Sequence, residues 1–236
     1  RDANIASLSP KNLNMYQDLA LLFGKVYLVI LVVNVILVLL LYRRLPAKVR
    51  SVHFFLLGSL ATDLASRWLF YQGENNLFLL HIYTLWELLA WGWFFNLVFG
   101  HTSKTQQFFF GGVGVMGILL VLNSVFLEPL TGFNSNAKTL VQVLLIGFAI
   151  RYFFLAFGKI DLTQAVAQAV TFINFAVLLY YSGTLFIFMF SRLLREYGVA
   201  SVQQHGLWVI NALLLVVFHL LIFISLWIPL RRRPKY

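Results

Sequence analysis

The chain has 236 residues, of which 61% are hydrophobic and only 11% are charged. A soluble domain has about half apolar and a quarter charged residues. This composition therefore excludes an ordinary soluble enzyme, a disordered chain and a fibrous repeat, and it predicts a polytopic membrane protein. The net charge of +10 does not indicate a nucleic-acid partner, because the basic residues form short clusters that flank apolar runs, as membrane topology requires.

The predicted elements begin with a short polar segment, 1–21, in which Pro10 follows Ser9 as the first position of an interfacial helix over 10–20. Apolar runs follow, each near the roughly 20 residues that a helix needs to cross the hydrocarbon. The predicted spans are about 22–42, 52–71, 77–98, 107–127, 139–157, 168–190 and 207–229, and a basic tail covers 230–236. Because these runs are continuously apolar, we predict an all-α protein, a seven-transmembrane-helix bundle that forms a single membrane domain over 1–236.

Lysine and arginine are unevenly shared between the two sides of the predicted bundle, and this asymmetry sets its orientation. With the N-terminus outside, the cytoplasmic side holds eleven basic residues, namely Arg43, Arg44, Lys48, Arg50, Lys104, Arg151, Lys159, Arg231, Arg232, Arg233 and Lys235. The outer side then holds five, namely Arg1, Lys11, Lys138, Arg192 and Arg195. We therefore predict an outer N-terminus and a cytoplasmic C-terminus, with Arg231, Arg232 and Arg233 placed to bind lipid head groups.

Polar residues inside the second and third predicted spans are the most informative feature of the chain. Those of the second span follow steps of three and four and so share one helix face; they are Ser59, Thr62, Asp63, Ser66 and Arg67. In the third span His81, Thr84 and Glu87 follow at steps of three. An ionised side chain at mid-bilayer costs on the order of 3 kcal/mol, so both faces should look into the bundle. We predict that Asp63, Arg67, His81 and Glu87 meet between these two helices.

Polar residues of other spans are expected to complete an intramembrane pocket between the second, third, sixth and seventh helices. The pocket residues are Asn174 and Tyr181 of the sixth span and Asn211 and His219 of the seventh, with Tyr27, Asn34 and Asn123 as further polar neighbours. Two interpretations stay open for the charged residues. They form either an internal ion pair that fixes helix packing or a ligand or proton site.

The residues also exclude several chemistries. Cysteine is absent, so no disulfide, thiolate nucleophile or cysteine metal site can form. The seventh span has no lysine for a retinal Schiff base, and the histidines show neither zinc spacing nor a matched pair for haem. No nucleophile elbow, phosphate loop or dinucleotide fingerprint appears. We therefore expect no cofactor, no metal site and no catalytic residue.

The third span also carries a short motif. Residues His81 to Glu87 read HIYTLWE, which resembles a His-x-Tyr-Thr-x-x-Glu pattern of uncharacterised bacterial seven-helix inner-membrane proteins. The resemblance implies a bacterial inner (cytoplasmic) membrane and an important third helix, and it carries no known activity.

Together these observations predict a non-enzymatic integral membrane protein, either a receptor-like or sensory module or an accessory subunit of a membrane complex. A small proton-coupled transporter or channel is the main alternative, and a membrane-embedded lipid-modifying enzyme is a third. The expected partners are membrane lipids, with other membrane subunits, a homodimer or a small-molecule ligand left open. Four glycines, Gly111, Gly112, Gly114 and Gly117, form a small-residue face suited to bundle packing or to a dimer contact.

Overall fold

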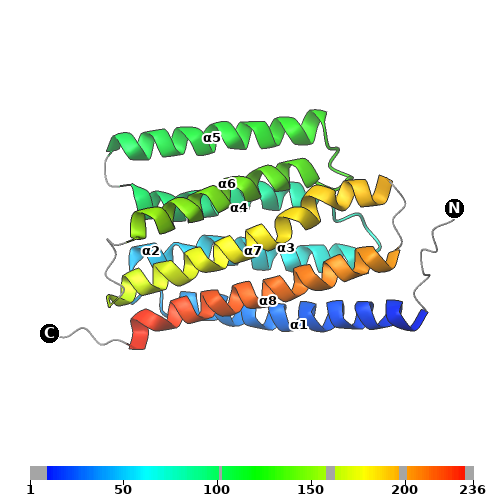
Figure 1. Cartoon of the computed structure of the whole chain (residues 1–236), viewed down its shortest axis with the longest axis horizontal. Coiled ribbons are helices and arrows are strands. Elements are labelled where there is room, and N and C mark those ends of the chain that lie inside the picture. The colour runs from blue at the N-terminus through cyan, green and yellow to red at the C-terminus, as the bar shows by residue number, and fades with distance from the viewer. Residues whose placement is uncertain (1–9, 101–102, 158–162, 197–200, 232–236) are drawn as a thin grey trace.

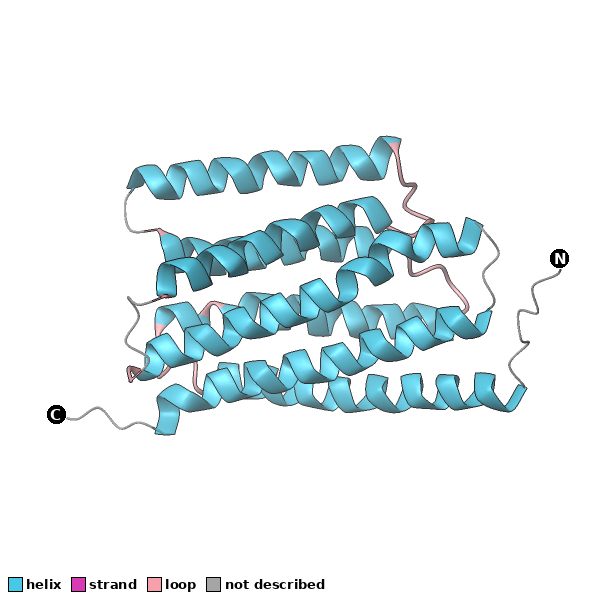
Figure 2. Cartoon of the chain, in the orientation of Figure 1, coloured by secondary structure: helices cyan, strands magenta, loops and turns pink. Residues whose placement is uncertain are grey.

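The computed structural model describes residues 10–100, 103–157, 163–196 and 201–231, which form long helices and, within those ranges, no strand (Figure 2). The helices are α1 (Pro10–Leu40), α2 (Ala47–Arg50), α3 (Val52–Tyr71), α4 (Phe78–Phe99), α5 (Ser103–Phe126), α6 (Ser135–Ala156), α7 (Ala165–Glu196) and α8 (Ser201–Arg231). The axes of the long helices are roughly parallel, and successive helices alternate in direction. The α1 helix therefore begins at one end of the bundle, and α8 ends at the other (Figure 1).

Six of the long helices are long and apolar enough to cross a membrane, as expected for an integral membrane protein. They are α1, α4, α5, α6, α7 and α8. Each coincides with one of the predicted spans. The remaining predicted span is α3, which has 20 residues but is not among these six. Asp63, Arg67 and the other polar residues of its inner face lower its mean hydropathy.

Three boundaries differ from those predicted. The separate interfacial helix over 10–20 does not form, because α1 runs unbroken from Pro10 to Leu40. Residues 11–23 contain no proline or glycine, so nothing interrupts the helical hydrogen bonds there. The α7 helix continues beyond the predicted end of its span, to Glu196. The α8 helix begins before the predicted start of its span, at Ser201.

The helices enclose a core centred on α4. Contacts between neighbours close a ring in the order α1, α3, α4, α6, α7, α8 and back to α1, while α5 packs outside it, against α4 and more lightly against α6. Of the six apolar helices, α4 is the most buried and α5 the least. The fully buried indole of Trp91 on α4 contacts Phe218 of α8, with ring centroids 6.2 Å apart. Polar residues of α4 are therefore surrounded by protein.

Candidate functional site

Glu87 of α4 is fully buried and lies at the centre of a hydrogen-bonded group drawn from three helices. Its Oε2 lies 2.5 Å from the ammonium nitrogen of Lys138 on α6. The hydroxyl of Tyr181 on α7 donates to the other oxygen, Oε1, at 2.8 Å. One turn along α4, Trp91 Nε1 donates to the Tyr181 oxygen at 2.8 Å. These four residues, which we call the Glu87 cluster, leave neither carboxylate oxygen without a partner.

Aromatic rings surround the ammonium of Lys138, which is itself buried. Its nitrogen lies 5.1 Å from the ring centroid of Tyr83, 5.8 Å from that of Tyr181 and 5.4 Å from that of Phe188. The faces of such rings attract cations at this distance. They offset part of the cost of taking both charges out of water, which for a buried ion pair can exceed the attraction between the partners.

A second buried carboxylate, Glu128, holds the turn of α6 that carries Lys138. Its oxygens accept hydrogen bonds from the backbone N–H groups of Ser135 at 3.0 Å and Asn136 at 2.9 Å, and from the Asn123 side chain at 2.8 Å. A carboxylate at a helix N-terminus satisfies unpaired donors and favours the positive end of the helix dipole.

Asp63 and Arg67 form a separate group between α1 and α3. Arg67 Nε donates to Asp63 Oδ2 at 2.6 Å, as the i, i+4 spacing favours. Tyr27 of α1 donates to Asp63 Oδ1 at 2.6 Å, and Arg67 also donates to the Gly24 carbonyl at 3.3 Å. The side chains of Arg67 and Asp63 are 35% and 18% exposed. This group therefore lies at the side of the bundle, whereas the Glu87 cluster is enclosed.

The predicted quartet of Asp63, Arg67, His81 and Glu87 therefore needs correction, because these residues separate into three groups. His81 turns toward the end of α5 and the connection that follows it: Nδ1 lies 2.8 Å from Ser124 Oγ of α5, and Nε2 lies 3.4 Å from the Gly132 carbonyl. The physical reason is that α6 brings its own cation against Glu87, so Arg67 is free to pair within its own helix.

The other predicted pocket residues take different places. Tyr181 joins Glu87, as described above, but Thr84 and Asn174 each donate to a backbone carbonyl of their own helix, at 2.7 and 2.9 Å. His219 lies against α1, where its carbonyl accepts a hydrogen bond from Asn34 at 2.9 Å. Among the described residues, Asn211 Oδ1 and His219 Nδ1 have no hydrogen-bond partner.

The predicted lipid-binding arginines are only partly described. Arg231 ends α8, is exposed, and lies over the Trp227 ring at 5.8 Å. Arg232 and Arg233 lie outside the described residues.

Lys138 is the functional residue that sequence reasoning missed. Its position in the sequence predicts an outer basic residue, whereas its side chain is buried within the bundle. One signal could have found it. A buried carboxylate requires a partner, and Lys138 immediately precedes the predicted span 139–157. Trp91 carried no comparable signal, because a tryptophan in an aromatic-rich helix is normally a packing residue.

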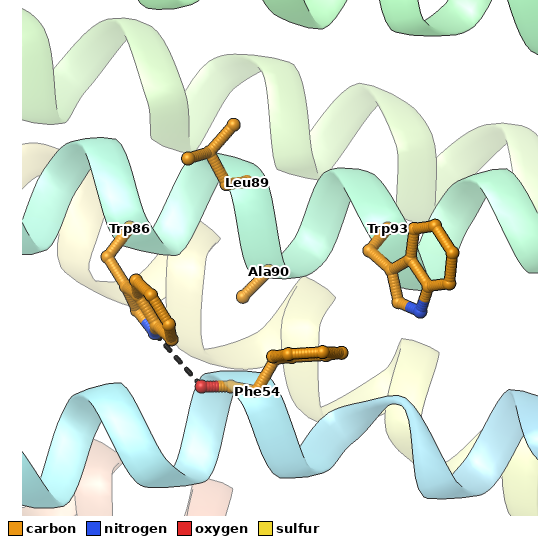
Figure 3. A pocket seen from close by; sticks show the side chains of 5 residues that line it. All are labelled: Phe54, Trp86, Leu89, Ala90 and Trp93. Carbon is orange, nitrogen blue, oxygen red and sulfur yellow. Dashed lines mark hydrogen bonds between the residues drawn. The ribbon is translucent and has the colours of Figure 1, made fainter.

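An apolar groove of about 230 Å³ lies outside the bundle between α3 and α4. Phe54 on α3 and Trp86, Leu89, Ala90 and Trp93 on α4 line the groove (Figure 3). Trp86 crosses to α3, where its indole N–H donates to the Phe54 carbonyl at 2.9 Å. The groove is apolar and does not include Glu87, so it suits hydrocarbon and not a polar substrate.

In the part of the chain that the structure describes, no three His, Asp or Glu side chains gather in a way that could hold a metal ion. Comparisons with protein-family models, with curated proteins and with solved structures find no match.

Proposed function

We propose that the chain is a seven-span protein of the bacterial inner membrane, with its N-terminus outside and its C-terminus in the cytoplasm. The 20 residues of α3 support a seventh span, because they extend over roughly 30 Å at 1.5 Å per residue. The bonds of Asp63 and Arg67 to each other and to α1 lower the cost of placing these charges in hydrocarbon. The excess of basic residues at the C-terminal end supports the orientation.

The role that this geometry supports best is non-enzymatic: a receptor-like or sensory module, or an accessory subunit of a membrane complex. The observation that carries this proposal is the Glu87 cluster, in which both carboxylate oxygens are engaged and the side chain is fully buried. A general acid or base must reach its substrate directly or through one water. A carboxylate that instead joins α4, α6 and α7 is suited to controlling how these helices pack.

The Glu87–Lys138 pair would give such a module two states. A buried ion pair is weak as a source of stability, but it is costly to break from one side only. A ligand or partner that engages one charge, or that moves α6, would leave the other charge unpaired. Because Tyr181 binds Glu87 directly, α7 would respond as well. A ligand can shift the equilibrium between these two states only by as much as its affinities for them differ.

Proton flux across proteoliposomes tests this proposal against the transporter alternative. The full chain is reconstituted with a pH-sensitive dye inside the vesicles, a pH gradient is imposed with and without a potential, and the wild type is compared with Glu87→Gln. We expect both proteins to give the leak rate of empty vesicles, because Glu87 is closed off from both sides. Glu74→Gln, which removes a carboxylate from an exposed loop position, is the matched control.

A flux above the leak that disappears in Glu87→Gln but persists in Glu74→Gln would overturn the proposal and favour a small proton-coupled transporter or channel. Release of a head group from vesicle lipids by the wild type, absent in Glu87→Gln, would instead favour the lipid-modifying enzyme.

A further inference from the structure

A second cavity, of about 250 Å³, lies between α4, α5 and α6, away from the Glu87 cluster. The α5 helix contributes Phe109, Gly112, Val113 and Met116, whose steps of three and four define one helix face. The other lining residues are Phe99 of α4 and Leu144, Phe148 and Arg151 of α6. We refer to this cavity as the α5 crevice. Its walls are apolar except at Arg151.

The α5 crevice exists because α5 is loosely packed. This helix stands outside the ring and is the least buried of the apolar helices (Figure 1). A Cβ atom added at Gly112 would meet no heavy atom within 4 Å, and the same holds for its neighbour Gly111. These glycines therefore leave space beside α5 and do not bring a neighbouring helix into close contact.

The position of Arg151 gives the α5 crevice a polar end. Arg151 lies five residues before the end of α6, yet its guanidinium lies 5.5 Å from the ring centroid of Phe99, the last residue of α4. The side chain thus extends toward the end of the bundle at which α8 finishes, as long basic side chains do near a membrane surface. From that end, the crevice runs inward from Phe109 to Met116, a distance of seven helical steps or about 10 Å.

Among the described residues, Arg151 forms no ion pair. Both ion pairs formed among the described residues involve other side chains, Asp63 with Arg67 and Glu87 with Lys138. Arg151 is exposed, and its guanidinium lies over the Phe99 ring. A guanidinium at the mouth of an apolar crevice, without an ion-pair partner in the part of the chain that the structure describes, matches a ligand with an anionic head and a hydrocarbon tail, because guanidinium groups bind phosphate oxygens in a bidentate manner.

We propose that the α5 crevice binds one anionic phospholipid, with its phosphate on Arg151 and the start of an acyl chain between α5 and α6. The lipid would occupy the leaflet at the C-terminal end of the bundle and would complete the packing of α5. This site is separate from Arg231, Arg232 and Arg233, and it does not depend on the role proposed for the Glu87 cluster.

Native mass spectrometry of the purified full chain tests this site. The protein is equilibrated in detergent with equal amounts of phosphatidylglycerol and phosphatidylcholine, and retained lipid is counted. We expect the wild type to retain one phosphatidylglycerol at least about fivefold more often than one phosphatidylcholine. Arg151→Gln should remove this preference, whereas Arg44→Gln, an exposed arginine at the same end of the bundle, should keep it.

A second pair of variants tests the crevice without altering charge. Gly112→Leu places a side chain inside the crevice and should lower retention of phosphatidylglycerol about fivefold. Gly111→Leu adds the same side chain at a neighbouring position outside the lining and should not. Equal retention of the two lipids by the wild type, or an unchanged preference in Arg151→Gln, overturns the proposal. A dimer that Gly112→Leu disrupts would instead assign the crevice to a second copy of the chain.

Discussion

Removal of the Lys138 ammonium is the most direct perturbation of the Glu87 cluster. The variant Lys138→Met keeps an unbranched apolar side chain beside the rings of Tyr83 and Phe188, but it leaves the Glu87 carboxylate without a cation. Loss of one partner of a buried ion pair costs about 3–5 kcal/mol, because the remaining charge stays desolvated. We expect the free energy of unfolding to fall by this amount.

The reciprocal variant, Glu87→Gln, keeps a side-chain oxygen that can accept the Tyr181 hydrogen bond and leaves the Lys138 ammonium unpaired. The aromatic rings still attract that ammonium, at about 0.5–2 kcal/mol for each favourable contact. The loss should therefore be smaller than in Lys138→Met. In the double variant no charge remains, and the expected cost is about 1–3 kcal/mol for one unsatisfied amide donor.

The double-mutant cycle measures the energy of this pair. Together, the losses of the two single variants should exceed the loss of the double variant by about 1–3 kcal/mol, within the range for residues in direct contact. The assay is reversible unfolding in mixed micelles on addition of a denaturing detergent, followed by tryptophan fluorescence. Single losses that add to the double loss within about 0.5 kcal/mol would mean that the two charges do not interact, and the Glu87 cluster would have to be abandoned.

Three further predictions follow from other parts of the structure. In a chain without cysteine, Lys48→Cys should be labelled only in inverted vesicles, and labelling in intact cells would refute the proposed orientation. Gly58→Ala should cost about 1–3 kcal/mol in the same unfolding assay, because its Cβ would lie 1.7 Å from Trp86 Nε1. Gly147→Ala, where nothing lies within 4 Å, should be neutral or stabilising, and equal effects would contradict the packing. Arg67→Leu should cost about 1.5–3 kcal/mol, the value of a hydrogen bond to a charged group; a loss larger than that of Lys138→Met would reverse the ranking of the two ion pairs.

The helices themselves could be predicted from the sequence. An apolar run of about 20 residues forms a helix in lipid because every backbone group must be bonded within the segment. Six predicted spans therefore coincide with long apolar helices. The local pair of Asp63 and Arg67 could also be predicted from the sequence, since i, i+4 spacing places both side chains on one helix face.

The partner of Glu87 could not be predicted in the same way. Lys138 lies 51 residues further along the chain and Tyr181 lies 94 residues away. Their meeting depends on which helices become neighbours and on how each is rotated about its axis. A hydrophobic run specifies that a helix spans the bilayer, but it is compatible with several rotations and neighbours. Only the packed bundle decides which buried charges meet, because the cost of leaving one unpaired depends on all the helices around it.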